Sequence, residues 1–172
     1  MTKSVLLFLA CILCTYCLAQ DHTSEASVQV MAPPIKDMNL LSTWSAGNTP
    51  FNDIWGYIDS QGKEYAIMGS RSHYYFVNIS NPTNPQMVDG FAGGNTTIWR
   101  DMKTYGQWAY GVCDSCNEGL SIFRMGDSPA SNGVEFLRQD KSYFTAAHNI
   151  FVDEPNGRLY IIGSNTQAGG VI

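Results

Sequence analysis

Short apolar runs separated by turn residues dominate the chain, and they recur in the same order. A tyrosine-led run appears three times, as Tyr65-Ala66-Ile67-Met68, Tyr110-Gly111-Val112-Cys113 and Tyr160-Ile161-Ile162-Gly163. The copies stand about 45–50 residues apart, a period typical of one four-stranded sheet per repeat. Beyond the N-terminal apolar stretch, no segment places apolar residues at the i, i+3, i+4, i+7 spacing of an amphipathic helix. The pattern therefore predicts an all-β fold.

The first complete repeat predicts four strands, and its separators are rich in the Gly, Pro, Asn and Asp residues that turns require. The second repeat has the same order, and the third supplies two strands and the beginning of another. The predicted strands are roughly 54–58, 64–69, 74–79 and 86–91, then 99–105, 108–112, 120–125 and 134–138, then 149–152, 158–163 and 171–172. Upstream of them, Leu40–Trp44 reads as a further strand.

Repeated four-stranded sheets indicate a β-propeller, with blades at about 52–91, 97–138 and 147–172. Leu40–Trp44 is then expected to be the ring-closing strand of one blade, because such pairing removes free strand edges. About two and a half blades cannot close a ring of at least about four. We therefore expect an incomplete propeller, the N-terminal part of a longer protein. The alternative is an open stack of sheets that dimerises to cover its ends.

The N-terminus has the features of a secretory signal peptide over residues 1–19: Lys3, the apolar stretch Val5–Cys17, and small residues before the cleavage position. About 13 apolar residues are too few for a membrane helix, which needs about 20. Its removal leaves two of the five cysteines, and the formal net charge changes from −5 to −6 because Lys3 is lost and no acid is. A flexible leader without periodicity follows over residues 20–38. We expect a secreted protein without a membrane span, too acidic to bind nucleic acid.

Several short segments match one known family. These are Asp53-Ile54-Trp55-Gly56, Gly62-Lys63-Glu64-Tyr65-Ala66, Phe76-Val77-Asn78-Ile79-Ser80-Asn81-Pro82, Ile98-Trp99-Arg100-Asp101-Met102-Lys103 and Ala147-His148-Asn149-Ile150. In them the chain resembles the choice-of-anchor B family, secreted proteins built from LVIVD-type propeller repeats that continue beyond the length of this sequence. The resemblance covers about residues 51–172. It implies a secreted or surface-displayed propeller and supplies no catalytic residues.

Once the signal peptide is removed, Cys113 and Cys116 are the two cysteines that remain. They form a C-x-x-C at the end of a predicted strand. In a secreted chain this spacing favours a structural disulfide that stiffens a hairpin loop. A redox pair and half of a zinc site are the alternatives, although few further ligands are available for zinc.

Two sequons are candidate N-glycosylation sites, at Asn78 and at Asn95. Asn95 follows a pair of glycines and is expected in a turn. Asn78 falls within a predicted strand, so its modification requires that its side chain face solvent.

Polar residues stand where each repeat begins, and they are the main candidates for a functional site. They are Asp53, Arg100, Asp101, His148 and Asn149. Because the first strand of each propeller blade lines the central channel, these side chains are expected to converge at one mouth of it. Asp, His and Asn together could hold a divalent metal, and Arg with Asp could hold a polar ligand. Alternatively, they satisfy neighbouring backbone groups, and Arg100 pairs with a carboxylate across blades.

The favoured function is an extracellular binding or scaffold module, whose unassigned ligand is an extracellular protein or a glycan. The alternative is a metal-assisted enzyme that uses the polar residues of the channel mouth, centred on His148. No nucleophile elbow, zinc-helix or phosphate-loop motif is present, which favours the module. The geometry of Asp101 and His148 distinguishes the two. An enzyme needs both within coordination distance of one point, with a second-shell partner on the other ring nitrogen of His148, whereas a module would have the side chains in backbone hydrogen bonds.

Overall fold

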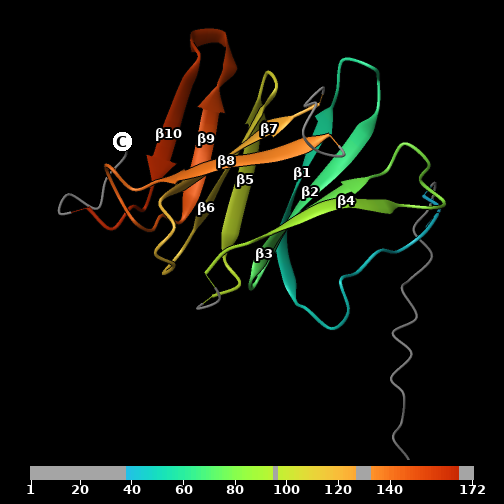
Figure 1. The fold of residues 1–172 in the computed structure, drawn as a ribbon, viewed down its shortest axis with the longest axis horizontal. Coiled ribbons are helices and arrows are strands. Elements are labelled where there is room, and N and C mark those ends of the chain that lie inside the picture. The colour runs from blue at the N-terminus through green and yellow to red at the C-terminus, as the bar shows by residue number, and fades with distance from the viewer. Residues whose placement is uncertain (1–37, 95–96, 127–132, 167–172) are drawn as a thin grey trace, which may run out of the picture. The chain divides into compact units, whose positions relative to one another are not determined.

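The computed structural model describes residues 38–94, 97–126 and 133–166, and all of its strands belong to a compact unit that begins at Leu40. The described residues form antiparallel sheets and contain no α-helix (Figure 1). The first sheet is β1 (Phe51–Ile58), β2 (Glu64–Ser70), β3 (His73–Asn78) and β4 (Gln86–Ala92). The second is β5 (Arg100–Tyr105), β6 (Trp108–Cys113), β7 (Leu120–Met125) and β8 (Val134–Asp140). The third is β9 (Asn149–Asp153) and β10 (Arg158–Ile162), joined by the 3₁₀ turn η1 (Glu154–Asn156).

Several sequence predictions fall on residues that the structure does not describe. The predicted signal peptide, almost all of the predicted leader, the sequon residue Asn95 and the last predicted strand are among them. Within the described part of the chain, no helix has the length and apolar character needed to cross a membrane.

Turn chemistry explains why the strands end where they do. In the β1–β2 hairpin, the Asp59 carboxylate accepts hydrogen bonds from the backbone N–H groups of Gln61 (2.9 Å) and Lys63 (2.8 Å). Gly62 has a φ of 79°, which L side chains rarely adopt. The chain therefore reverses within the Asp-Ser-Gln-Gly segment that the sequence predicts as a turn.

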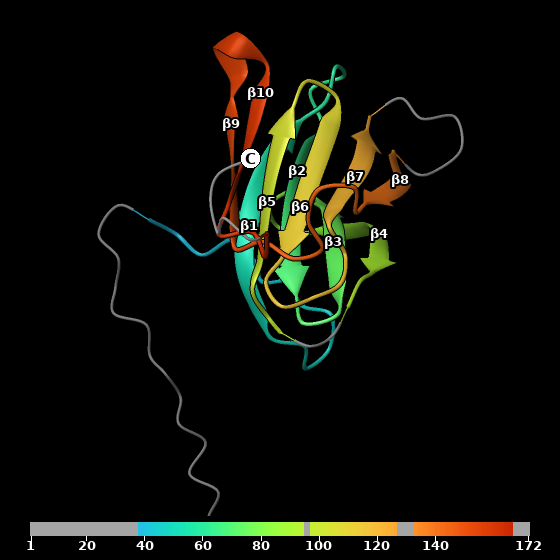
Figure 2. The same cartoon turned by 90° about the vertical axis from the view of Figure 1, so that its left-hand side faces the viewer.

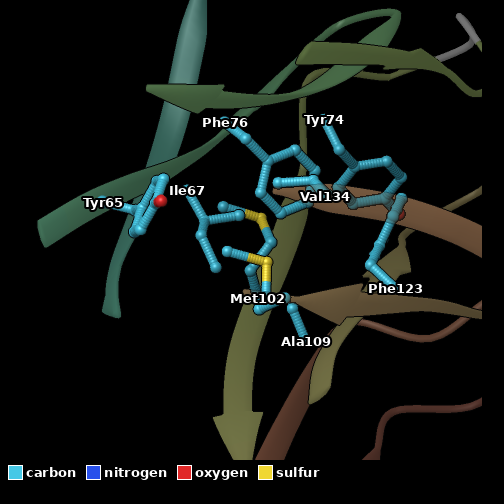
Figure 3. Close-up of a cluster of buried hydrophobic side chains, with 9 residues drawn as sticks. Tyr65, Ile67, Tyr74, Phe76, Met102, Ala109, Phe123 and Val134 are labelled. Carbon is cyan, nitrogen blue, oxygen red and sulfur yellow. The ribbon is translucent and has the colours of Figure 1, made fainter. Parts of the chain in front are cut away.

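The main core lies between the first and second sheets. Figure 3 shows side chains of β2 and β3 meeting those of β5, β6, β7 and β8 in one buried cluster. Its members are Tyr65, Ile67, Tyr74, Phe76, Met102, Ala109, Phe123, Met125 and Val134. A second cluster lies between β6 and the β9–β10 hairpin, formed by Val112, Phe144, Ala147, Ile150 and Ile161. Each sheet thus buries apolar surface against its neighbour in sequence, which is the main favourable term in its folding.

The first strands of the three sheets are joined by hydrogen bonds between residues 48 or 49 apart in the chain. Asn52 and Arg100 are 48 residues apart, and the Asn52 side chain donates to the Arg100 carbonyl (2.9 Å) and accepts from its N–H (3.2 Å). Asp101 and Asn149, again 48 residues apart, are bonded in the next pair of sheets. These contacts indicate a repeat of about 48 residues, the interval that also separates Asp53, Asp101 and Asn149 in the sequence.

This register differs from the one that the tyrosine-led runs suggest. Tyr65 lies opposite Tyr57, and Tyr110 lies opposite Lys103. Lys103 comes 46 residues after Tyr57 (103 − 57), two fewer than the 48 residues between Asn52 and Arg100. The residues paired with Tyr65 and Tyr110 are therefore not equivalent, and neither are the two tyrosines. Likewise, β5 begins at Arg100, and Trp99 lies just before it with 54% of its surface exposed. Buried strands have similar apolar compositions, so similar tyrosine-led runs occur at positions that are not equivalent in the two sheets.

Residues 40–44 do not form the strand that the sequence predicts. A strand needs an adjacent edge to pair its backbone groups, and no such edge meets this segment among the described residues. Side chains hold it instead: the Ser42 hydroxyl donates to the Pro82 carbonyl (2.6 Å), and the Trp44 ring packs on Tyr75 with 5.6 Å between centroids. The segment is therefore held to the first sheet by side-chain contacts and not by strand pairing.

Candidate functional site

A hollow of about 290 Å³ lies where the first strands of the three sheets begin. These strands are β1, β5 and β9, each from a different sheet (Figure 2). The hollow is lined by Asn52, Asp53, Trp99, Arg100, Asp101, Lys103, His148 and Asn149. All five residues singled out in the sequence contribute to this lining, although their side chains have different partners.

Asp101 is nearly buried and connects the second sheet to the third. Its Oδ2 accepts a hydrogen bond from the backbone N–H of Ile150 (2.7 Å) and one from the Asn149 side-chain amide (3.3 Å). Its Oδ1 is bound by the ammonium group of Lys103. That ammonium also lies over the Trp55 ring, 4.3 Å from its centroid. The carboxylate of Asp101 therefore satisfies the backbone at the start of β9, a structural role.

Asp53 is half-buried beside Asp101 in the same hollow. Burial raises the pKa of the Asp53 carboxyl, and its hydrogen bond and like charge with Asp101 raise it further. The backbone N–H of Ile54 and the positive charge of Lys103 act in the opposite direction without cancelling the rise in pKa. Asp53 thus holds its proton more tightly than a free aspartate does.

We expect Asp53→Asn to stabilise the protein at neutral pH and to have less effect in acid. The folded state binds the Asp53 proton more tightly than the unfolded chain, so ionising Asp53 costs stability. This cost is absent below the ordinary Asp pKa of 3.8 and complete above the raised value. Thermal unfolding at pH 3 and pH 7 measures it, with the exposed Glu64→Gln as the matched control. A loss of stability at pH 7, or the same gain at both pH values, would contradict the expectation.

Arg100 does not present its charge to the hollow. Its side chain is fully buried, and Nη2 lies 2.7 Å from Oε1 of Glu118 and bonds to the Gly94 carbonyl. Its guanidinium stacks over Tyr74, 4.9 Å from the ring centroid. Use of this charge on a ligand stays a prediction. The guanidinium pairs with a carboxylate, as the alternative predicts, although that carboxylate comes from the same repeat and not from another blade. The reason is that a buried guanidinium needs a counter-charge within the protein.

Glu118 is the partner that the sequence does not reveal. It lies in the β6–β7 connection, where Oε1 accepts from the Gly94 N–H and Oε2 accepts from the Tyr74 hydroxyl (3.0 Å). Burial, together with the negative charge of Glu118, raises the pKa of Tyr74. Glu118 belongs to no periodic sequence pattern, because it lies in a loop of irregular backbone. That loop directs its side chain between the first and second sheets.

His148 lies at the edge of the hollow and has a different carboxylate partner. Its Nδ1 is 3.1 Å from Oδ2 of Asp114, and 58% of its side chain is exposed. Asp101 is bonded to β9 instead. Asp101 is therefore engaged by backbone, while His148 has a carboxylate partner on Nδ1.

Cys113 and Cys116 form a disulfide with 5.4 Å between their Cα atoms, as predicted for the C-x-x-C. In the described part of the chain, one group of three metal-ligand residue types lies within 4.8 Å, namely these two cysteines and Glu118. The disulfide leaves no thiolate to bind a metal, and the Arg100 guanidinium already supplies the positive charge beside Glu118. This group does not fit a metal centre.

Asn78, the described sequon residue, ends β3 and is half-buried. Its side-chain oxygen accepts a hydrogen bond from the backbone N–H of Ser80 (2.9 Å), which closes a local turn. Ser80 is exposed. Glycosylation at Asn78 remains a prediction.

Comparison with family models, with curated proteins and with solved structures finds no match for this chain. The comparisons therefore do not identify the choice-of-anchor B family.

Proposed function

We propose that the sheets are blades of a secreted β-propeller that acts as an extracellular binding module, with its ligand in the hollow at the starts of β1, β5 and β9. The sequence resemblance to choice-of-anchor B proteins and the N-terminal signal-like segment support secretion and the propeller class. The order of the sheets supports it as well: each contacts the next through its first strand, as blades do around a channel.

The outer face of the first sheet gives further support to the propeller arrangement. Ile54 is 60% exposed, whereas Met102, the equivalent residue in the second sheet, is buried between sheets. Ile54 lines an apolar groove of about 290 Å³ on that face. The face that carries Met102 in the second sheet is therefore covered by the first sheet, whereas the corresponding face of the first sheet, which carries Ile54, is open. A neighbouring blade would cover that open face.

The convergence of equivalent polar positions in one hollow is the observation that carries the binding proposal. The hollow holds the half-buried Asp53 carboxyl, the largely exposed His148 side chain and the exposed indole of Trp99, beside side chains already bonded between the sheets. Hydrogen-bonding groups beside an aromatic face suit a hydroxyl-rich ligand, which stacks on the ring and bonds to the polar groups. A glycan is the ligand class with this chemistry.

The enzyme alternative has less support. Asp101 accepts the backbone N–H of Ile150, and His148 is paired with Asp114, so each side chain already has a structural partner. Asp101 is thus placed as a module would have it, whereas the Asp114 carboxylate on Nδ1 of His148 is a partner that a metal-bound histidine would also have.

Binding to an array of extracellular glycans, followed by titration calorimetry with a retained glycan, tests the proposal. We expect Trp99→Ala to weaken binding about tenfold, because the stacking surface is lost. Tyr143→Ala is the control, since Tyr143 is 75% exposed and does not line the hollow. Failure to retain any glycan, or equal affinity for Trp99→Ala and the unmodified protein, would reject the hollow as a glycan site.

A further inference from the structure

The sheets have two faces with different roles, and both internal interfaces join these faces in the same way. The first sheet contacts the second through the face that carries Ile67, and the second contacts the third through the face that carries Val112. We call this the leading face of a sheet. The opposite face, the trailing face, carries Met102 in the second sheet and Ile150 in the third, each buried against the preceding sheet. In each interface, therefore, a leading face packs on a trailing face.

One face of each kind is open. The trailing face of the first sheet carries Ile54 and Ile58, and both side chains are exposed. The leading face of the third sheet carries the exposed side chains of Phe151 and Ile162. The Phe151 ring lies beside that of Tyr160 on this face, with 6.3 Å between their centroids. The two open apolar faces are thus the two kinds of face that bury each other inside the chain.

The interface between the first and second sheets shows how the two kinds of face fit together. There the Trp55 indole N–H on the leading face donates to Oγ1 of Thr104 on the trailing face (3.1 Å). Phe151 follows Trp55 by 96 residues, which is two repeats of 48, and so occupies the same position on its leading face. Gly56 precedes Thr104 by 48 residues, which is one repeat. A Cβ at Gly56 would have no atom within 4 Å, so the first sheet has room for an aromatic ring at the position that Phe151 would reach.

We propose that copies of this chain associate head to tail, with the third sheet of one copy covering the open trailing face of the first sheet of another. A second copy is the partner that fits, because it carries the matching leading face and repeats the packing of the two internal interfaces. The contact is heterologous, since two different surfaces meet in it. A second copy then supplies the neighbouring blade that would cover the first sheet. This association is independent of any ligand in the hollow at the starts of β1, β5 and β9, so a negative result in the glycan experiment leaves it in place.

Sedimentation velocity of the purified protein at about 1 μM and about 100 μM tests the association. We expect the mass to rise with concentration. Ile54→Glu and Phe151→Glu should each weaken the association at least about a hundredfold, because each places an unpaired charge in the contact. Both side chains are exposed within one chain, so both variants keep the fold. Tyr143→Glu is the control, since Tyr143 is exposed and lies in the connection between β8 and β9, on neither face. A single-chain mass for the unmodified protein at the higher concentration would overturn the proposal.

Mixing the two variants tests the direction of the contact. The intact third sheet of Ile54→Glu can cover the intact first sheet of Phe151→Glu, so an equal mixture should contain pairs with one copy of each variant. Isotope labelling of one variant and native mass spectrometry identify these mixed pairs. A contact between two first sheets would instead leave Phe151→Glu associated on its own. That result, or an equal mixture that contains only single chains, would overturn the head-to-tail arrangement.

Discussion

Glu118→Ala should lower the free energy of unfolding by about 3–5 kcal/mol, because it leaves a buried charge without its partner. The Arg100 side chain has no exposed surface and lies 2.7 Å from the Glu118 carboxylate. Removing that carboxylate also leaves the Gly94 N–H and the Tyr74 hydroxyl without their acceptor. Each buried polar group that loses its partner adds about 1–3 kcal/mol of desolvation cost, although these costs are not additive with the loss of the ion pair.

Urea denaturation followed by fluorescence measures this change. Glu135→Ala is the control, since the Arg124–Glu135 pair is about one-third exposed and should contribute no more than about 1 kcal/mol. Glu118→Gln should fall between the two: its amide oxygen accepts from Arg100 and Gly94, and its amide N–H₂ can donate to the Tyr74 oxygen. If Glu118→Ala and Glu135→Ala have similar effects, the buried pair does not stabilise the sheets as described.

Phe123→Ala should destabilise the protein by about 3–5 kcal/mol, the usual cost of removing a buried aromatic ring. Phe123 is 1% exposed and comes from β7 in the second sheet. Its ring centroid lies 5.1 Å from that of Phe76 and 5.4 Å from that of Tyr74, both in the first sheet. The cavity left by alanine would therefore open at the centre of the main core, where two sheets would have to move together to fill it.

Phe151→Ala is the control for the core prediction, because Phe151 is 56% exposed on β9. Its effect should stay below about 1 kcal/mol. A single cooperative transition with an unchanged denaturant slope is expected for both variants. Two separate transitions in Phe123→Ala would show that the first and second sheets remain folded independently of their shared core, and a small loss would show that the core relaxes to fill the space.

The strands could be predicted largely from local sequence, because each is a short apolar run bounded by turn residues. The strand at Leu120–Met125 has the bounds that the sequence gives, and β1 begins only a few residues before its predicted start. The segment at 40–44 has the same composition but no strand structure. This segment differs from the strands in its surroundings and not in its own residues, since a strand forms only where another edge is available to pair with it.

The residues of the hollow were predictable because polar side chains recur where apolar strands begin. Their orientations were not. Asp101 and Arg100 are adjacent in sequence and point to opposite sides of β5, one toward β9 and the other toward Glu118. Alternation along a strand predicts opposite sides, and only packing decides which side is enclosed. Glu118 was missed because a loop has no period from which a side-chain direction follows.

In these hydrogen bonds between first strands, the side chain comes from the earlier sheet and the backbone group from the next one. Asn52 contacts the backbone of the sheet that follows its own, and Asp101 does the same for the sheet after that. Each of these joints involves only adjacent sheets, so no joint depends on how many sheets the protein contains. Stability in such an array is close to a sum of sheet terms and nearest-neighbour terms. Each joint therefore stabilises one pair of neighbouring sheets, and the loss of one leaves the contacts of the other in place.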